Sequence, residues 1–325
     1  MILAKDFRRA VATCEISHPA FLAEFNYFQR RLLQASEGAT PVVEWLIGPS
    51  GAGKSALIRA LQRQWPETKV DGLRQAPVVA ASLPPYVSPT LLPGSVLEAF
   101  GMPPSTSMRN DTTGQLSRRM RDLFTKSQTH SLLLDEVNHM VESSTRVKVR
   151  DGGDWFKVVS GQLSLFMFGM PHLAELFKSN EQLRRRGMRR REFRPYDWNE
   201  PNDRDAFARC VRTYSDLFAS SPWPIGLSLT ALVHHCYLLS GGLVGVLSKF
   251  MIELASRADD GVAHAYDLDD CKGAAATIDC AGEAEFPAFV SDVVTDFELL
   301  GSFAHVIETN GLSMKRSSPS PASPA

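Results

Sequence analysis

The residues best suited to chemistry form one glycine-rich stretch, which reads GPSGAGKSA from Gly48 to Ala56. Its glycines let the backbone curl so that successive N–H groups point inward, and such a nest binds phosphate oxygens. Lys54 adds a cation, and the hydroxyl of Ser55 is a hard oxygen ligand suited to Mg²⁺. The flanking patterns predict a buried strand before the stretch and a helix after it. The spacing G-x-x-x-x-G-K-S therefore predicts a loop that binds a nucleoside triphosphate through Gly48, Pro49, Ser50, Gly51, Ala52, Gly53, Lys54, Ser55 and Ala56.

A second group of reactive side chains lies further along the chain, in HSLLLDEVNHM. Residues 131–134 are mostly apolar and predict a strand, with Asp135 and Glu136 at its end. We expect Asp135 to hold Mg²⁺ together with Ser55, and Glu136 to orient and polarise the attacking water. Alone, two acids after an apolar run indicate a solvated strand end. Paired with the phosphate loop, they predict a site that uses ATP and Mg²⁺ as cofactors.

Composition narrows the class of protein. The 325 residues are 44% hydrophobic and 22% charged with a formal net charge of -1, so contact with nucleic acid requires a local basic patch. No apolar run approaches the roughly 20 residues that a membrane span needs. The five cysteines are scattered without the paired spacing of a zinc site. We expect a reduced, cytoplasmic protein with no membrane partner.

The remaining patterns predict the elements that position these residues. Apolar runs indicate further strands at 78–83, 163–171 and 192–196, and helices alternate with them. From Asn199 three helical segments follow one another, and the end is rich in Ser and Pro. The predicted fold class is α/β: a P-loop parallel sheet with helices on both faces, followed by a small all-α lid domain. The expected parts are an N-terminal helical segment, the ATPase domain, the helical lid, a C-terminal extension and a disordered tail, over 1–40, 41–198, 199–262, 263–312 and 313–325.

The whole arrangement resembles an AAA+ ATPase, and more narrowly the TniB/TnsC family, the ATP-dependent regulators of Tn7-like and related transposons. The resemblance spans roughly Ile16 to Ala258, and the two ATP-binding motifs within it are shared by many ATPases. The segments that carry it are HPAF (18–21), LIGPSGAGKS (46–55), LLLDEVNHM (132–140), LFMFGMP (165–171), EQLRRRG (181–187) and SGGLVGVLSKFM (240–251).

This resemblance implies a homo-oligomer, a ring or helical filament that assembles with ATP on double-stranded DNA. Such proteins mark an insertion site and recruit a DDE transposase, often with a TniQ-type targeting protein, and hydrolysis dismantles the filament. It also implies that a neighbouring subunit donates an arginine to the nucleotide. Arg186 stands where the family pattern QL-x-x-R places that arginine, and Arg184 and Arg185 are close rivals. A solvated basic helix end explains the same residues equally well.

The chain departs from the AAA+ pattern at two places. Many AAA+ proteins carry Asn or Thr at the end of the strand after the acidic one, where this chain has Gly169 and Met170. Their helical domain often carries an arginine that contacts the γ-phosphate, where this chain has Val246, with Lys249 as the nearby basic residue. Hydrolysis is therefore expected to be slow or dependent on a partner.

Contact with DNA is expected from RVKVR, which places Arg146, Lys148 and Arg150 on one face if it is extended. Cations there would hold phosphates without reading bases, although an exposed polar hairpin accounts for the pattern as well. The arginine run 184–191 is a second candidate. The competing functional interpretation is another AAA+ switch, either secretion-associated or a DnaA/Orc-like loader. A metabolic P-loop kinase fits the acidic pair and the helical C-terminal part less well.

Overall fold

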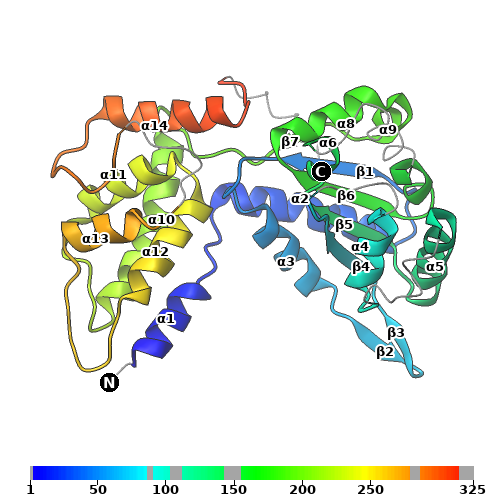
Figure 1. Cartoon of the computed structure of the whole chain (residues 1–325), viewed down its shortest axis with the longest axis horizontal. Coiled ribbons are helices and arrows are strands. Elements are labelled where there is room, and N and C mark those ends of the chain that lie inside the picture. Colours follow the sequence, from blue (N-terminus) through cyan, green and yellow to red (C-terminus); the bar gives the residue numbers. More distant parts are fainter. Residues whose placement is uncertain (1–2, 86–90, 103–111, 143–154, 279–285, 315–325) are drawn as a thin grey trace. The chain divides into compact units, whose positions relative to one another are not determined.

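The computed structural model describes the chain except residues 1–2, 86–90, 103–111, 143–154, 279–285 and 315–325. It divides into two units, one of residues 17–194 and one that combines residues 1–16 with 195–325. Among the described residues, the first unit, the sheet unit, contains all the strands, and the second, the helical unit, is built from helices (Figure 1). The predicted Arg146, Lys148 and Arg150, and nearly all of the predicted disordered tail, lie outside the described residues.

The sheet unit is built on five parallel strands in the order β4-β5-β6-β1-β7. Their bounds are β1 Val43–Ile47, β4 Val78–Ser82, β5 Ser131–Asp135, β6 Ser164–Gly169 and β7 Arg191–Glu192. Strands β1, β5 and β6 are mostly apolar and buried almost throughout, as expected of a parallel sheet covered on both faces, and Glu44 is the buried charged residue of β1. The predicted α/β class is confirmed, although the last strand is only two residues long.

Helices cover both faces because parallel connections are right-handed. The connection from β1 to β4 runs across the sheet in one direction and the later connections return, so their helices lie on opposite faces (Figure 1). Phe28 of α2 packs against Phe166 and Phe168 of β6, which places α2 on the sheet. The described helices of this unit include α2 Pro19–Ser36, α3 Lys54–Gln64, α4 Leu91–Ala99, α5 Thr113–Lys126, α6 His139–Glu142, α8 Ala174–Ser179 and α9 Glu181–Arg186, with a further helical turn at 155–159 and a 3-10 turn at Pro171–Leu173.

Two details of the sheet unit add to the sequence prediction. The segment 171–187 contains two separate helices, because the side chain of Asn180 accepts a hydrogen bond from the backbone of Leu183 and so starts α9. A small hairpin, unforeseen, follows α3 and consists of β2 Thr68–Val70 and β3 Leu73–Gln75. Its tight turn is formed by Asp71 and Gly72, both with positive φ.

The helical unit comprises α10 Pro201–Ala219, α11 Leu229–Ser240, α12 Val244–Ser256, α13 Leu268–Ala275 and α14 Asp296–Thr309, together with α1 Ala4–Ala12. The predicted N-terminal segment 1–40 is thus shared between the units, because Phe7 of α1 packs on Phe218 and Trp223. The predicted extension is not separate either: Ser302 of α14 donates to the carbonyl of Leu238 in α11. The three helices expected after residue 199 are present, whereas α14 was not anticipated.

Among the described residues, no single helix is long and apolar enough to cross a membrane, and the bent pair α11–α12 meets that test only when its two helices are combined across a 115° bend.

Candidate nucleotide-binding site

The phosphate loop joins the end of β1 to the start of α3, so the predicted nucleotide-binding residues 48–56 lie in the loop and in the first turn of that helix. Gly51 and Gly53 have φ of 77° and 101°, left-handed values that glycine adopts without a steric penalty. Gly48 is required for a different reason, since a Cβ there would lie 2.6 Å from the carbonyl oxygen of Phe193. The loop therefore has the backbone of a phosphate-binding nest, and the residues that follow begin a helix whose N-terminus favours an anion.

Lys54 is the cation of this loop. Only 6% of the residue is exposed, and Nζ donates 2.8 Å hydrogen bonds to the carbonyl oxygens of Gly48 and Pro49. Burial lowers the pKa of Lys54, while the charges of Glu136 and Asp135 oppose that shift. A buried ammonium that rests on neutral carbonyls is favourably placed to gain an anionic partner. The loop thus fits a triphosphate by its own chemistry.

Asp135 reaches the loop across the sheet. Its strand β5 is separated from β1 by β6, yet the Ser55 hydroxyl donates a 2.6 Å hydrogen bond to Asp135 Oδ2. Both groups are oxygen ligands of the kind that Mg²⁺ prefers, and such sites commonly combine one or two protein oxygens with waters and substrate phosphates. These two residues fit a Mg²⁺ ion, which they would hold beside the phosphate loop.

Glu136 has an unusual backbone. Its φ of 55° is left-handed, a conformation that costs a residue with a side chain about 1–3 kcal/mol. Its N–H donates to Asp135 Oδ1 at 3.0 Å, and the next N–H, of Val137, donates to the carbonyl of Phe168 at 3.0 Å. Strain at a carboxylate beside a phosphate loop is typical of a functional position.

Three further side chains near the loop had been given no role. Phe193 and His18 are buried and stack with their ring centroids 6.2 Å apart, and the Phe193 ring would lie 3.6 Å from a Cβ at Gly53. His18 Nδ1 accepts the N–H of Phe21 and thereby caps α2. Asn138 is 1% exposed and contacts the end of β6. Its neighbours in DEVNHM are largely polar, so no local sequence pattern marks Asn138 as buried.

The three arginines of α9 differ in their contacts. Arg186 donates to the carbonyl of Lys157 and to Ser160 Oγ at 3.2 and 3.4 Å, so its partners are neutral. Arg185 pairs with Glu181 at 2.7 Å. Arg184 is exposed, and no hydrogen bond or ion pair joins its side chain to another described residue. All three guanidinium groups belong to the sheet unit and lie on an exposed helix end.

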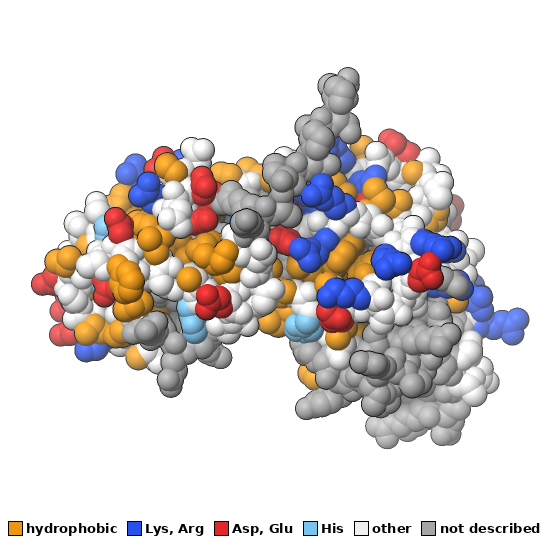
Figure 2. All heavy atoms as spheres, turned by 90° about the horizontal axis from the view of Figure 1, so that it is seen from above, with side chains coloured by type: hydrophobic (Ala, Val, Ile, Leu, Met, Phe, Trp, Pro, Cys, Tyr) orange, Lys and Arg blue, Asp and Glu red, His pale blue; other side chains and the backbone are white. Residues whose placement is uncertain are grey.

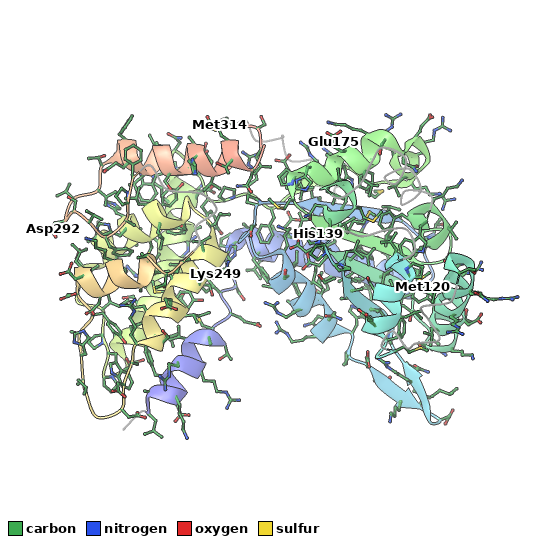
Figure 3. The ribbon with its side chains drawn as sticks, in the orientation of Figure 1. Met120, His139, Glu175, Lys249, Asp292 and Met314 are labelled. Carbon is green, nitrogen blue, oxygen red and sulfur yellow. The ribbon has the colours of Figure 1, made fainter. Side chains whose placement is uncertain are left out.

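The two departures noted in the sequence have clear structural counterparts. Gly169 ends β6, and its carbonyl accepts the N–H of Gly48 at 3.1 Å, so it lies directly beside the phosphate loop. Val246 is buried in α12, whereas Lys249 of the same helix is exposed (Figure 3). Val246 and Lys249 belong to the helical unit, while Gly169 and the phosphate loop belong to the sheet unit.

Comparison with known proteins identifies the class of the fold. Residues 43–177 match the family model described as "AAA domain". No curated protein matches the chain significantly in sequence. Solved structures match in fold at 12–15% identity, with TM-scores of 0.58, 0.51 and 0.52. They are Cdc6p from Pyrobaculum aerophilum, covering 95% of this chain and 86% of that one, ORC2 of Aeropyrum pernix in ADPNP–ADP complexes (94% and 73%), and ORC1 of Aeropyrum pernix in complex with DNA (83% and 69%).

These likenesses establish the fold, because sequence identity this low carries no further information about activity. The matched segment contains the phosphate loop and the acidic residues after β5, and its strand order is that described above. Residues 43–177 therefore form an AAA-type ATPase domain, in a chain whose fold is similar to Cdc6 and ORC proteins.

Proposed function

We propose that the protein is an ATP-hydrolysing AAA+ switch that assembles as a multimer on double-stranded DNA. The observation that carries this proposal is the convergence of Lys54, Ser55, Asp135 and Glu136 at one edge of the sheet, with Ser55 and Asp135 already joined at 2.6 Å. This set provides what phosphoryl transfer to water requires: a cradle, a cation, a metal position and a carboxylate.

Each residue has one task in this mechanism. The loop N–H groups and Lys54 would hold the phosphates, and Ser55 and Asp135 would hold Mg²⁺, which supplies positive charge beside the phosphate oxygens. The Glu136 carboxylate accepts a hydrogen bond from water and orients it for attack in line with the leaving oxygen. The protein thus contributes mainly positioning and electrostatic stabilisation.

A trans-acting arginine completes the site in a multimer. We propose Arg186 for this role from the sequence pattern, and its neutral partners, Lys157 O and Ser160 Oγ, are ones that a guanidinium exchanges favourably for a phosphate. Arg184 is the strongest rival, because no described residue pairs with it, while Arg185 would first have to leave Glu181. An arginine that reaches the γ-phosphate from a neighbour makes hydrolysis depend on assembly.

The DNA-binding part of the proposal rests on local charge and on fold. Figure 2 shows Lys and Arg side chains gathered on a face of the sheet unit. Exposed arginines at the end of α9 and before β7 belong to this unit, namely Arg184, Arg185, Arg186, Arg189 and Arg190. One similar structure, that of Aeropyrum pernix ORC1, is in complex with DNA. Contact with phosphates rather than base edges would make binding independent of sequence. Arg146, Lys148 and Arg150 remain proposed contacts on their sequence pattern.

Two biological settings fit this switch. The motifs that resemble the TniB/TnsC family favour a transposition regulator, in which the ATP-bound multimer marks a target and recruits a DDE transposase with a TniQ-type protein. The similarity to Cdc6p over 95% of the chain favours an initiator-like or loader-type switch instead. We propose the first, because the resemblance also extends to four segments outside the two ATP-binding motifs that many ATPases share.

The test of the proposed function is binding of a labelled random-sequence duplex, followed by fluorescence anisotropy with ATP, a slowly hydrolysed analogue, ADP or no nucleotide. Cooperative binding confined to ATP and the analogue, with a steep dependence on salt, is expected. The Lys54→Ala variant is the control and should bind in none of these states. Absence of DNA binding in every state would contradict the DNA-binding function and leave a protein-remodelling or secretion ATPase.

A second measurement distinguishes the two settings. Purified DDE transposase, with and without a TniQ-type protein, is added to the preformed complex on DNA, and its retention is measured by co-sedimentation. Retention that requires both this protein and ATP supports the transposition regulator. Failure of the transposase to bind, with DNA binding intact, would favour the loader-type switch.

A further inference from the structure

The turn that follows β5 is tied to the strands on both of its sides. On one side, the N–H of Leu83, just after β4, donates to the carbonyl of Asp135 at 3.1 Å. On the other, the N–H of Val137 donates to Phe168 of β6 at 3.0 Å. His139, which begins α6, adds a 2.9 Å hydrogen bond between its Nδ1 and the carbonyl of Leu83 (Figure 3). The left-handed backbone of Glu136 is therefore held from both neighbouring strands.

The side chain of Asn138 makes a further hydrogen bond, to the backbone just after β6. Its Oδ1 accepts the N–H of Met170 at 3.0 Å, and only 1% of the residue is exposed. Its backbone carbonyl also accepts the N–H of Val141, so the residue anchors the first turn of α6 as well. A buried amide with this geometry fixes the end of one strand relative to the turn after another.

The amide of Asn138 lies where a side chain of residue 169 would be. A Cβ built on Gly169 would come within 2.8 Å of Asn138 Oδ1 and 3.2 Å of its backbone nitrogen. Gly169 in turn accepts the N–H of Gly48 at 3.1 Å. One short path of contacts thus links the turn that carries Glu136 to the first residue of the phosphate loop.

We propose that Asn138 is a positioning residue for ATP hydrolysis: its buried amide, in the space left by Gly169, sets Glu136 at a fixed distance from the phosphate loop. This inference rests on the proposed ATPase function. A carboxylate must lie within hydrogen-bond reach of the attacking water, and a displacement of about 1 Å costs on the order of 100-fold in rate. The end of β6 supplies no polar side chain of its own, because the strand ends at Gly169 and Met170 follows it.

The first experiment compares Asn138→Ala with wild type for steady-state ATP turnover and for affinity towards a fluorescent ATP analogue. We expect kcat to fall by about 10- to 100-fold while nucleotide affinity changes by less than about threefold, because the phosphate contacts are unchanged. Asn310→Ala is the matched control: Asn310 is also buried and its side chain makes a 2.8 Å hydrogen bond, but it lies at the end of α14 in the helical unit. Its kcat should equal that of wild type.

The second experiment is a double-mutant cycle with Gly169→Ala. Alone, this change should lower kcat as Asn138→Ala does, because the added methyl displaces the amide. In the double variant the amide is already absent, so kcat should fall no further than it does in Asn138→Ala alone. Additive losses, or an Asn138→Ala variant that loses nucleotide affinity and kcat together, would overturn the positioning role.

The outcomes separate this inference from the function on which it rests. If the wild-type protein hydrolyses ATP and Asn138→Ala has the same kcat, the positioning role of Asn138 is overturned and the proposed ATPase function is unaffected. Absence of turnover in the wild-type protein, with and without DNA, would overturn both.

Discussion

The hydroxyl of Ser55 and the carboxylate of Asp135 form a 2.6 Å hydrogen bond between groups 80 residues apart in the chain. It joins the first turn of α3 to the end of β5, across the intervening strand β6. The two oxygens are thus held together by the fold before any ion binds. A preorganised pair of this kind lowers the ordering cost of binding a cation.

The metal role of this pair predicts the behaviour of Asp135→Asn. An amide keeps the size of the side chain but removes the charge, so Mg²⁺ should be bound more weakly. We expect the Mg²⁺ concentration at half-maximal turnover to rise by at least about tenfold, since a lost charged contact is worth about 1.5–3 kcal/mol. Asp122→Asn, an exposed change on α5, should leave that concentration unaltered. An unchanged Mg²⁺ requirement in Asp135→Asn would remove Asp135 from the metal site.

Lys54→Ala should abolish nucleotide binding, because its ammonium is the cation within the phosphate loop. Removing one partner of a buried charge pair costs about 2–5 kcal/mol, so affinity for a fluorescent nucleotide should fall at least about 30-fold. Lys69→Ala in the exposed strand β2 is the matched control and should bind as wild type does. Tight binding by Lys54→Ala would be incompatible with the assigned loop.

Glu136→Gln should bind ATP normally and turn it over about 100- to 10,000-fold more slowly, since the amide no longer accepts a proton from water. Complexes with DNA formed in ATP should then persist, measured as a slower decay of anisotropy after dilution. Glu67→Gln is a suitable control, because Glu67 is exposed and pairs only with Arg74 among the described residues. Normal turnover in Glu136→Gln would assign the water-orienting role elsewhere.

Arg186→Ala should lose hydrolysis by about 1,000-fold or more while its monomer still binds ATP, as expected of an arginine donated in trans. The decisive measurement is the ATP turnover of a mixture of two variants. Subunits of Lys54→Ala, which cannot hold nucleotide but carry the arginine, should restore turnover to Arg186→Ala subunits. If Arg186→Ala hydrolyses at the wild-type rate, the same mixing experiment on Arg184→Ala and then Arg185→Ala identifies the residue that is used.

His18 predicts how stability depends on pH. Burial lowers its pKa to about 4 from 6.5, and its Nδ1 accepts a hydrogen bond, so the folded state holds it neutral. The unfolded chain binds the proton below 6.5, so stability should rise by about 3 kcal/mol as pH increases from 4 to 6.5 and be constant above. Urea unfolding over this range measures that slope.

His18→Asn should remove most of this dependence, because asparagine caps a helix without titrating there. His18→Ala should also flatten the slope and should be less stable than His18→Asn by about 1 kcal/mol at every pH, since the cap is lost. An unaltered slope in both variants would show that another group is responsible.

The sequence by itself determined the chemistry and most of the elements. Gly51, Gly53 and Lys54 mark the phosphate loop because few other residues permit its backbone and charge, and short, mostly apolar segments mark β1, β5 and β6. The parallel sheet followed from strands that alternate with helices, and it is confirmed. The hairpin β2–β3 and helix α14 were not predicted from the sequence, because the formation of short or weakly patterned segments depends on tertiary contacts.

Only the tertiary structure decided which distant groups meet. Strand order places Asp135 against Ser55, and the left-handed turn at Glu136 arises from hydrogen bonds to Leu83 and Phe168, which no local pattern encodes. Phe7 joins α1 to the helical unit because its apolar ring is buried there by Phe218 and Trp223. The amide of Asn138 can reach the end of β6 only because Gly169 has no side chain there to exclude it. Residue types carry chemistry, but distances between residues far apart in the chain are set by packing.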